Sequence, residues 1–200
     1  MQFPLVWWKD PCSMDIQQAL IESCIRKERK AEYALYKATY SYFMSICLRY
    51  THNQDRAKEV LNLGFYKILK HLDSFNAGTP FKPWARKIMI NTLINEYKKD
   101  KNHTSNINYV DSYFDDADYA DMNQAVAKIN ADQIYAFIAK LPPASRQVFN
   151  LYFIDGYKHR EIAEMLAISE GTSKWHLNAA REKLKEMILQ DQTIKVSADE

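Results

Sequence analysis

The chain has 200 residues, of which 47% are hydrophobic and only four are glycine, and its formal net charge is +2. A chain of this length and composition can bury one large core or two small ones, which excludes global disorder. So few glycines argue against strands joined by tight turns, and we expect an all-α fold.

The first 14 residues, MQFPLVWWKDPCSM, lack the basic start and long apolar centre of a secretory signal. No apolar run reaches the roughly 18 residues that a membrane helix needs. We therefore expect residues 1–14 to be a poorly ordered leader, and the protein to be cytoplasmic without inserting into a membrane. An anchor to a lipid surface through Trp7 and Trp8 is the alternative interpretation of this stretch.

Residues 15–101 are predicted to be helical, because apolar residues recur at spacings of three and four. The stretch THNQD interrupts the pattern and offers an N-cap to a second helix, RAKEVLNLGFYKILKHL. A loop, DSFNAGTPFKP, separates this helix from a third one, WARKIMINTLINEYKKDK.

Cysteine and histidine are arranged in no pattern that would bind a metal. Cys12, Cys24 and Cys47 contain no CxxC pair, and the five scattered histidines contain no HExxH pair. Neither a disulfide framework, a metal nor another cofactor is therefore expected. Cys24 and Cys47 fall within the apolar pattern and are predicted to be core residues.

Basic residues gather in one short stretch that runs from just before the third helix to its end, and an acidic segment follows it. At residues 102–131 the helical pattern fades and aspartates dominate, which predicts a flexible acidic linker. A basic segment beside a solvated acidic one is typical of proteins with a nucleic-acid-binding face. The basic residues are Lys82, Arg86, Lys87, Lys98, Lys99 and Lys101, and the aspartates are Asp111, Asp115, Asp116, Asp118 and Asp121.

A helical pattern returns at residues 132–190, before a tail at 191–200, so that two small helical domains joined by the acidic linker are predicted. In YKHREIAEMLAISEGTSKWHLNAAREKL two short helices meet at a turn, where Ser169 can cap the second helix and Glu170 lies near its positive end. Such a pair is typical of a helix-turn-helix, whose second helix enters the major groove of DNA. The residues expected to form its buried face are Ile162, Ala163, Leu166, Ile168 and Leu177.

The outer face of that second helix has the chemistry needed to bind DNA. Lys174 and Arg181 can contact phosphates or guanine, and Asn178 can pair with adenine. Trp175 offers a large apolar surface to a thymine methyl group. The alternative is that Trp175 belongs to the core and that the charged residues form an ordinary solvated face.

The segment LPPASRQVFNLYFIDGYKHREIAEMLAISEGTSKWHLNAAREKL resembles region 4 of bacterial sigma factors. The stretches DRAKEVLNLGFYKILK and FKPWARKIMINTLINEYKK are similar to parts of their region 2. Two such domains with a short linker resemble the extracytoplasmic-function (ECF) group, and the likeness covers about residues 31–189. The resemblance implies a protein without catalytic activity or a small-molecule substrate. It would bind core RNA polymerase, direct it to promoter DNA, help to open the duplex, and be regulated by an anti-sigma factor.

The resemblance also implies which residues meet the polymerase and the promoter's minus-ten element. Those for the polymerase lie on the second helix, where Asn62 stands for a usual glutamine and Leu63 for a usual acid: Glu59, Asn62, Leu63 and Tyr66. In the stretch FKPWARKIMINTLINEYKK, Phe81 and Trp84 are expected to pack rather than to wedge into DNA. The minus-ten candidates, with Asn76 placed to meet an extruded base, are Asn76, Lys82, Arg86, Lys87, Asn91, Asn95, Lys98 and Lys99.

For the minus-thirty-five element, the resemblance points to the helix-turn-helix. The candidates are Arg160, Thr172, Lys174, Trp175, His176, Asn178 and Arg181. Several positions depart from the family pattern. Ala167 replaces a turn glycine, Ser173 a core valine and Ala179 a basic residue, while Asn95 replaces an aspartate of region 2. Lysines at 98 and 99 replace an arginine pair, which keeps the phosphate attraction without the forked geometry.

Three other classes of protein share some of these features. A helix-turn-helix regulator that is not a polymerase subunit would have the same C-terminal half, but would carry a ligand pocket or receiver domain before it. A helical nuclease would need paired carboxylates on a structured element, whereas the dense acids here fall in the linker. A relative that binds only proteins stays an alternative because of the departures at Leu63 and Ala179.

Overall fold

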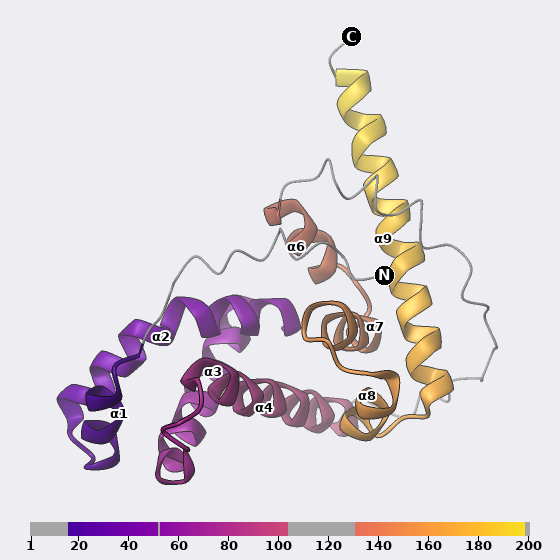
Figure 1. Ribbon diagram of the computed structural model, residues 1–200. Helices are drawn as coiled ribbons and strands as arrows, with labels where there is room; N and C mark the ends of the chain where they lie inside the picture. The colour runs from indigo at the N-terminus through magenta and orange to yellow at the C-terminus, as the bar shows by residue number, and fades with distance from the viewer. Residues whose placement is uncertain (1–15, 52, 104–130, 199–200) are drawn as a thin grey trace. The chain divides into compact units, whose positions relative to one another are not determined.

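The computed structural model describes residues 16–51, 53–103 and 131–198, and every regular element in these ranges is helical (Figure 1). The all-α prediction is thereby confirmed. Contacts between residues divide the chain into two compact units, with the division between Tyr97 and Lys98. The predicted leader and residues 104–130 of the predicted linker lie outside the described residues, so their boundaries stay predictions.

Among the described residues, the N-terminal unit contains four α-helices, the last of which continues past the division, and a short 3₁₀ turn. They are α1 (Gln18–Ile25), α2 (Arg29–Tyr50), α3 (Gln54–Lys70), the 3₁₀ turn η2 (Leu72–Ser74) and α4 (Phe81–His103). The helix α3 begins where THNQD predicted, because the side chain of Asn53 accepts a hydrogen bond of 2.8 Å from the backbone N–H of Arg56. Two lysines in its last turn, Lys67 and Lys70, place positive charge near the negative end of the helix dipole, which stabilises the helix.

The core of this unit is formed by one face of each helix. Gly64 allows α3 to approach α4 closely, since a β-carbon at that position would collide with the end of the Met89 side chain. The Met89 Sδ also lies 3.7 Å from the Cys47 Sγ of α2, so three helices meet at this point. Burial raises the pKa of the Cys47 thiol to about 12, as expected for a core residue rather than a reactive one. The largest fully buried side chains here are Leu35, Phe43, Ile46, Leu61, Ile68, Leu72, Met89 and Ile90.

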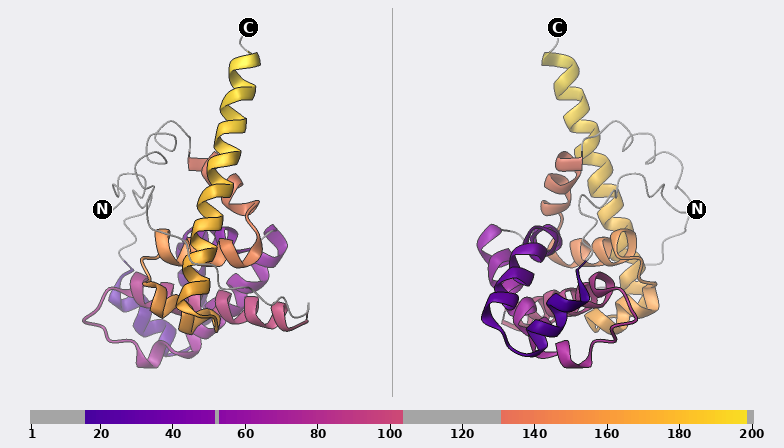
Figure 2. Two further views of the ribbon diagram at one scale, coloured as in Figure 1. Left: turned by 90° about the vertical axis from the view of Figure 1, so that its right-hand side faces the viewer. Right: turned by 60° about the vertical axis from the view of Figure 1, so that its left-hand side comes forward.

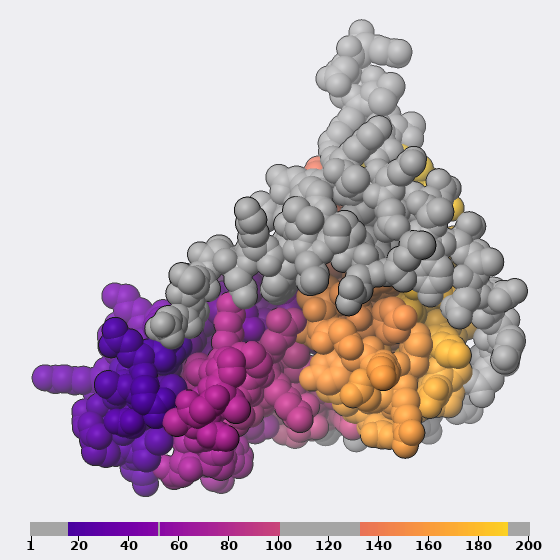
Figure 3. Space-filling view, in the orientation of Figure 1, coloured from indigo at the N-terminus to yellow at the C-terminus, as the bar shows by residue number. Residues whose placement is uncertain are grey.

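The C-terminal unit is built around one long helix, α9 (Glu170–Ala198), which is yellow in both views of Figure 2. Against it pack α6 (Ala131–Ala139), α7 (Pro143–Phe149) and α8 (His159–Leu166). The space-filling view shows the side chains of α7 and α8 in contact with the first turns of α9 (Figure 3). Its core includes Ile138, Leu141, Val148, Leu151, Ile162, Leu177, Ala180 and Leu184.

After α7 the chain forms a π-helical turn, η3 (Asn150–Ile154), where the sequence pattern suggested a continuing α-helix. The backbone N–H of Asp155 donates to the carbonyl of Asn150, five residues earlier. The fully buried Asn150 side chain donates to the Arg146 carbonyl at 3.0 Å, a local bond that competes with regular helix geometry. Gly156 then ends the turn with a φ of +77°, in the region that favours glycine.

Arg146 fastens α6 to α7. Its Nη2 donates to the carbonyl oxygens of Ala139 and Leu141, at 2.6 and 2.8 Å, which satisfies two acceptors at the end of α6. The side chain is buried, and this desolvation lowers the pKa of its guanidinium. A charged group is kept in the interior here because it supplies donors that no apolar residue could replace.

Replacing Arg146 by alanine should destabilise the C-terminal unit by about 2–4 kcal/mol, because the part-buried carbonyl of Ala139 and the buried carbonyl of Leu141 would lose their donor. Hydrogen exchange of the α7 and α9 amides, which reports the opening of this unit, would measure the loss. Arg160→Ala is the matched control, since the Arg160 side chain is 81% exposed and lies 3.6 Å from Glu164. Equal effects of the two substitutions would contradict the role given to Arg146.

Candidate nucleic-acid and polymerase interfaces

The helices α8 and α9 form the predicted helix-turn-helix. Ala167 ends α8 in the left-handed conformation, with a φ of 54°. The Ile168 N–H donates back to the Ala163 carbonyl, a bond that is typical of a helix end of this kind. The Ser169 Oγ then accepts the backbone N–H of Thr172 at 2.9 Å, so the predicted cap of the second helix is confirmed.

Two hydrogen bonds hold the buried face of α9. Ser173, at 0% exposure, meets the Nδ1 of His159 on α8 at 2.9 Å. His176, at 2% exposure, meets the Oγ of Ser145 on α7 at 3.1 Å. The His176 ring is therefore enclosed between α9 and α7 and is not on the outer side of the helix, while its assignment to the DNA contacts stays a prediction. Ser173, where the family pattern has valine, uses its hydroxyl in the same way.

The other candidates on α9 lie on its outer side. Lys174 is exposed, while Trp175, Asn178 and Arg181 are half-buried along the next turns. The Arg181 guanidinium lies 5.1 Å from the ring centre of Phe153, and its Nη1 donates to the Asn178 Oδ1 at 3.2 Å. Trp175 packs edge-on against the ring of His176, with the ring centres 4.9 Å apart. Because the side chain is only half-buried, Trp175 is not wholly a core residue.

Thr172 and Arg160 are the remaining candidates of the helix-turn-helix. The Thr172 hydroxyl is engaged with Ser169 at 2.9 Å, which ties it to the cap of the helix. Arg160, near the start of α8, is exposed and forms only a loose ion pair with Glu164. Such a pair contributes little to stability, which leaves the guanidinium able to exchange its partner for a phosphate.

The helix α4 presents a polar stripe to solvent. Lys87, Asn91 and Asn95 are exposed and lie four residues apart, so they occupy one face of the helix. Lys98 and Lys99 continue the stripe one turn further on, half-buried and exposed respectively. The opposite face of α4 is apolar and buried, which fixes the direction of the stripe.

At the start of α4 the aromatic candidates pack among themselves, as predicted. Phe81 is 7% exposed, and its ring and that of Trp84 both contact Phe75, at 5.7 and 5.0 Å. Lys82 places its Nζ 4.5 Å from the ring centre of Tyr42 on α2, while Arg86 is half-buried. These two cations are thus held closer to the body of the unit than Lys87.

The loop before α4 is closed by Asn76. Its side-chain Oδ1 accepts the Gly78 N–H at 3.0 Å, and its backbone carbonyl accepts the Thr79 N–H at 2.9 Å. The loop is therefore shaped by the residue proposed to meet an extruded base. With Oδ1 occupied, the amide nitrogen is the group of Asn76 that is placed to bind such a base.

The outer face of α3 brings together three of the four candidates for the polymerase. Glu59 and Asn62 are exposed, and Tyr66 is 62% exposed one turn further on. Leu63 is half-buried at the edge of the same face. A leucine at this position can pack against the edge of the core. A carboxylate there would lose contact with water, which is energetically costly.

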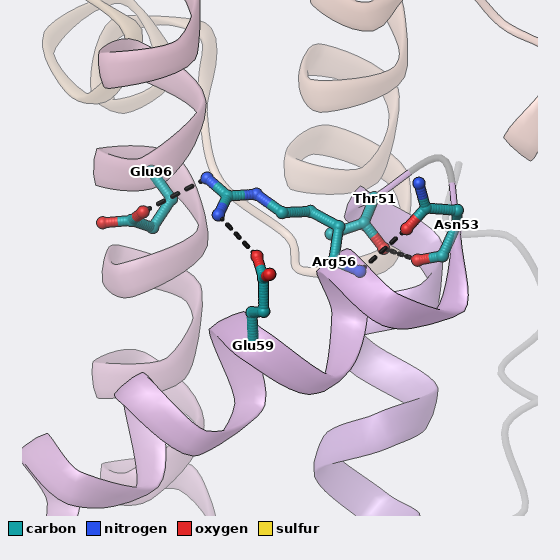
Figure 4. A network of polar contacts seen from close by, with 5 residues as sticks. All are labelled: Thr51, Asn53, Arg56, Glu59 and Glu96. Atoms are coloured by element: carbon teal, nitrogen blue, oxygen red, sulfur yellow. Dashed lines mark hydrogen bonds and ion pairs between the residues drawn. The ribbon is translucent and has the colours of Figure 1, made fainter.

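Arg56 connects this face to α4. Its Nη1 lies 3.0 Å from Glu59 Oε2, and its Nη2 lies 3.2 Å from Glu96 Oε2, so one guanidinium bridges two helices (Figure 4). The Glu96 side chain is only 12% exposed, which strengthens the attraction relative to a surface pair. Sequence reasoning missed Arg56 because its second partner is 40 residues away along the chain.

The part of the chain that the structure describes has neither a cluster of metal-binding side chains nor a membrane-spanning helix. No group of three or more histidine, cysteine, aspartate or glutamate residues there could hold a metal ion. No helix among the described residues is both long and apolar enough to cross a membrane.

Comparison with known proteins agrees with this geometry. The model of the family described as Sigma-70 region 2 matches residues 35–103, and that described as Sigma-70, region 4 matches residues 131–184. The ECF RNA polymerase sigma factor EcfG of Rhodopseudomonas palustris (strain TIE-1) is 24% identical over 143 residues, 70% of this chain and 75% of that protein. The RNA polymerase sigma-H factor of Pseudomonas aeruginosa is 25% identical over 175 residues, 84% of this chain and 91% of that protein.

A solved structure of the sigma factor RpoE with the anti-sigma factor NepR from Bartonella quintana is 17% identical, with a TM-score of 0.45. The matched region covers 79% of this chain and 96% of the RpoE chain.

The two domain matches, in this order, define a two-domain transcription initiation factor. The chain belongs to the sigma-70 family of RNA polymerase sigma factors, in its ECF group. It binds core RNA polymerase, directs the enzyme to specific promoters and assists promoter opening.

Replacing Arg56 by alanine should destabilise the N-terminal unit by about 1–3 kcal/mol, because the mostly buried Glu96 would lose its ion pair. Chemical denaturation of the full chain, followed by hydrogen exchange of the α3 and α4 amides, would measure this. Lys58→Ala is the control, because its 3.7 Å pair with the 93% exposed Asp55 should contribute less than about 0.5 kcal/mol. A loss from Arg56→Ala no larger than that of the control would contradict the bridging role.

Replacing Ala167 by glycine should stabilise the C-terminal unit by about 1 kcal/mol, because the left-handed conformation strains any residue with a β-carbon. The melting temperature of this unit should rise accordingly. Ala136→Gly, at an exposed position within α6, should instead cost about 1 kcal/mol through lost helix propensity. If both glycines destabilise the unit, the strain at Ala167 is not significant.

Proposed function

We propose that three separate helix faces divide the tasks of this sigma factor. The outer face of α3 binds core polymerase, the polar stripe of α4 binds the minus-ten element, and the outer side of α9 binds the minus-thirty-five element. The observation that carries the proposal is the orientation of α9. Its inner face is fixed by Ser173 and His176, so Lys174 and its neighbours are turned outward.

At the minus-thirty-five element, charge and base contacts come from different residues. Lys174 and Arg160 supply cations for the phosphates, which position the helix but carry no sequence information. Trp175 offers an apolar edge to a thymine methyl group, and the amide of Asn178 can form hydrogen bonds with adenine. A bidentate bond to adenine uses both ends of an amide, so Arg181 has to release the Asn178 oxygen on binding.

At the minus-ten element, Lys87, Lys98 and Lys99 attract the backbone, and Asn91 and Asn95 face the bases from the same stripe. A base of the separated strand exposes its pairing edge, which the amide nitrogen of Asn76 can approach from the loop. Lys82 and Arg86 extend the positive charge toward the start of α4. Because lysine binds phosphate as a point charge, this contact should tolerate variation in strand geometry.

The same proposal includes the protein's setting and regulation. The chain acts in the cytoplasm, where core polymerase is found, and it contributes recognition rather than catalysis. An anti-sigma factor holds it inactive, as in many members of the ECF group. Such a factor would act by covering the faces that bind polymerase or promoter.

Lys174→Ala should weaken promoter-dependent transcription at all promoter sequences. It should also reduce the slope of log affinity against log salt concentration by about one, because one phosphate contact is lost. Trp175→Ala should instead change which promoters are chosen, with a difference of about 1–3 kcal/mol at one base pair. Run-off transcription with purified core polymerase on a genomic promoter library would measure both effects.

The matched control is Lys183→Ala, which removes an exposed lysine of the same helix that is paired with Glu186 at 2.7 Å. It should leave promoter choice and the salt dependence unchanged. Unaltered promoter preference with Trp175→Ala would remove Trp175 from the reading surface.

A further inference from the structure

Tyr36 of α2 forms a hydrogen bond with a residue of the face proposed to bind polymerase. Its hydroxyl donates to the Oδ1 of Asn62 at 2.9 Å, across 26 residues of sequence. Asn62 is exposed on α3, one turn after Glu59 and one turn before Tyr66. The bond therefore joins a second helix to the middle of that face.

The tyrosine is held firmly enough to fix its hydroxyl in place. Its ring packs edge-on against Phe65, with ring centres 4.9 Å apart and planes at 82°. It also lies 5.6 Å from the ring of Tyr40. The hydroxyl donates its proton to Asn62, and burial raises the pKa of the Tyr36 phenol.

This bond determines what Asn62 offers to a partner. An amide carries its oxygen and its NH₂ group on the same carbon, pointing in different directions within one plane. With Oδ1 bound to the Tyr36 hydroxyl, the NH₂ group points away from that hydroxyl. Position 62 therefore presents a donor at the centre of the face.

We propose that Tyr36 is a positioning residue for polymerase binding, and that the polymerase surface opposite Asn62 presents an acceptor, either a carbonyl or a carboxylate oxygen. The inference rests on the proposed function of the α3 face. It deepens that proposal, because it names the chemistry of the contact and a residue that was not among the candidates. A fixed amide loses little rotational entropy on binding, which compensates for a side chain shorter than glutamine.

The test measures the dissociation constant of the full chain for purified core RNA polymerase, with circular dichroism to verify folding of each variant. Asn62→Ala should weaken binding about tenfold and Tyr36→Phe about three- to tenfold, since each removes part of one polar contact. The double variant should bind no more weakly than Asn62→Ala alone, because Tyr36 acts only through Asn62.

Asn62→Asp tests the polarity of the contact. It keeps an oxygen for Tyr36 but puts an acceptor in place of the NH₂ group, so binding should weaken at least about tenfold. Tighter binding of this variant would show that the polymerase presents a donor, and would overturn the inference. Tyr40→Phe removes a neighbouring hydroxyl without touching Asn62 and should bind as wild type.

The outcomes separate the two proposals. If Asn62→Ala and Asn62→Asp both bind as wild type, the α3 face does not contact polymerase at this point, and the proposed function of the face fails. If Asn62→Ala weakens binding but Tyr36→Phe has no effect, or has an equal effect in both backgrounds, the face stands and the positioning role of Tyr36 is wrong.

Discussion

The placement of α9 depends on two hydrogen bonds beneath it, between Ser173 and His159 and between His176 and Ser145. An apolar contact at these two positions would define the rotation of the helix less sharply, because the hydrophobic effect is not directional. A buried donor–acceptor pair is directional, and leaving it unmade is costly. The rotation of α9 about its axis, and hence the set of side chains that it presents, is fixed in this way. The outward positions of Lys174, Trp175 and Asn178 all follow from it.

In the N-terminal unit, the comparable constraint joins helices through side chains that lie partly at the surface. Arg56 links α3 to α4, and Tyr36 links α2 to α3. Each link ends on a residue of the face proposed to bind polymerase, Glu59 in one case and Asn62 in the other. The exposed residues that would meet a partner are therefore held by residues behind them, which lowers the entropy lost on binding.

Much of the fold could be predicted because its causes are local. Apolar residues at spacings of three and four predict helices whatever the rest of the chain does. The caps at Asn53 and Ser169 act within three residues, so their motifs are legible in sequence. The π-helical turn at Asn150 was missed, because it arises from a buried side chain whose environment is tertiary.

The sequence by itself determined an all-helical chain, the helix-turn-helix, and the residue types that suit DNA and polymerase, since these depend on periodicity and on motif. Only the tertiary structure decided which of those residues face outward. His176 lies between a lysine and an asparagine that are at least partly accessible, yet it is buried against α7. Arg56 and Tyr36 acquire their roles from partners 40 and 26 residues away. Contacts across such separations depend on how helices pack, and no local pattern in the sequence encodes them.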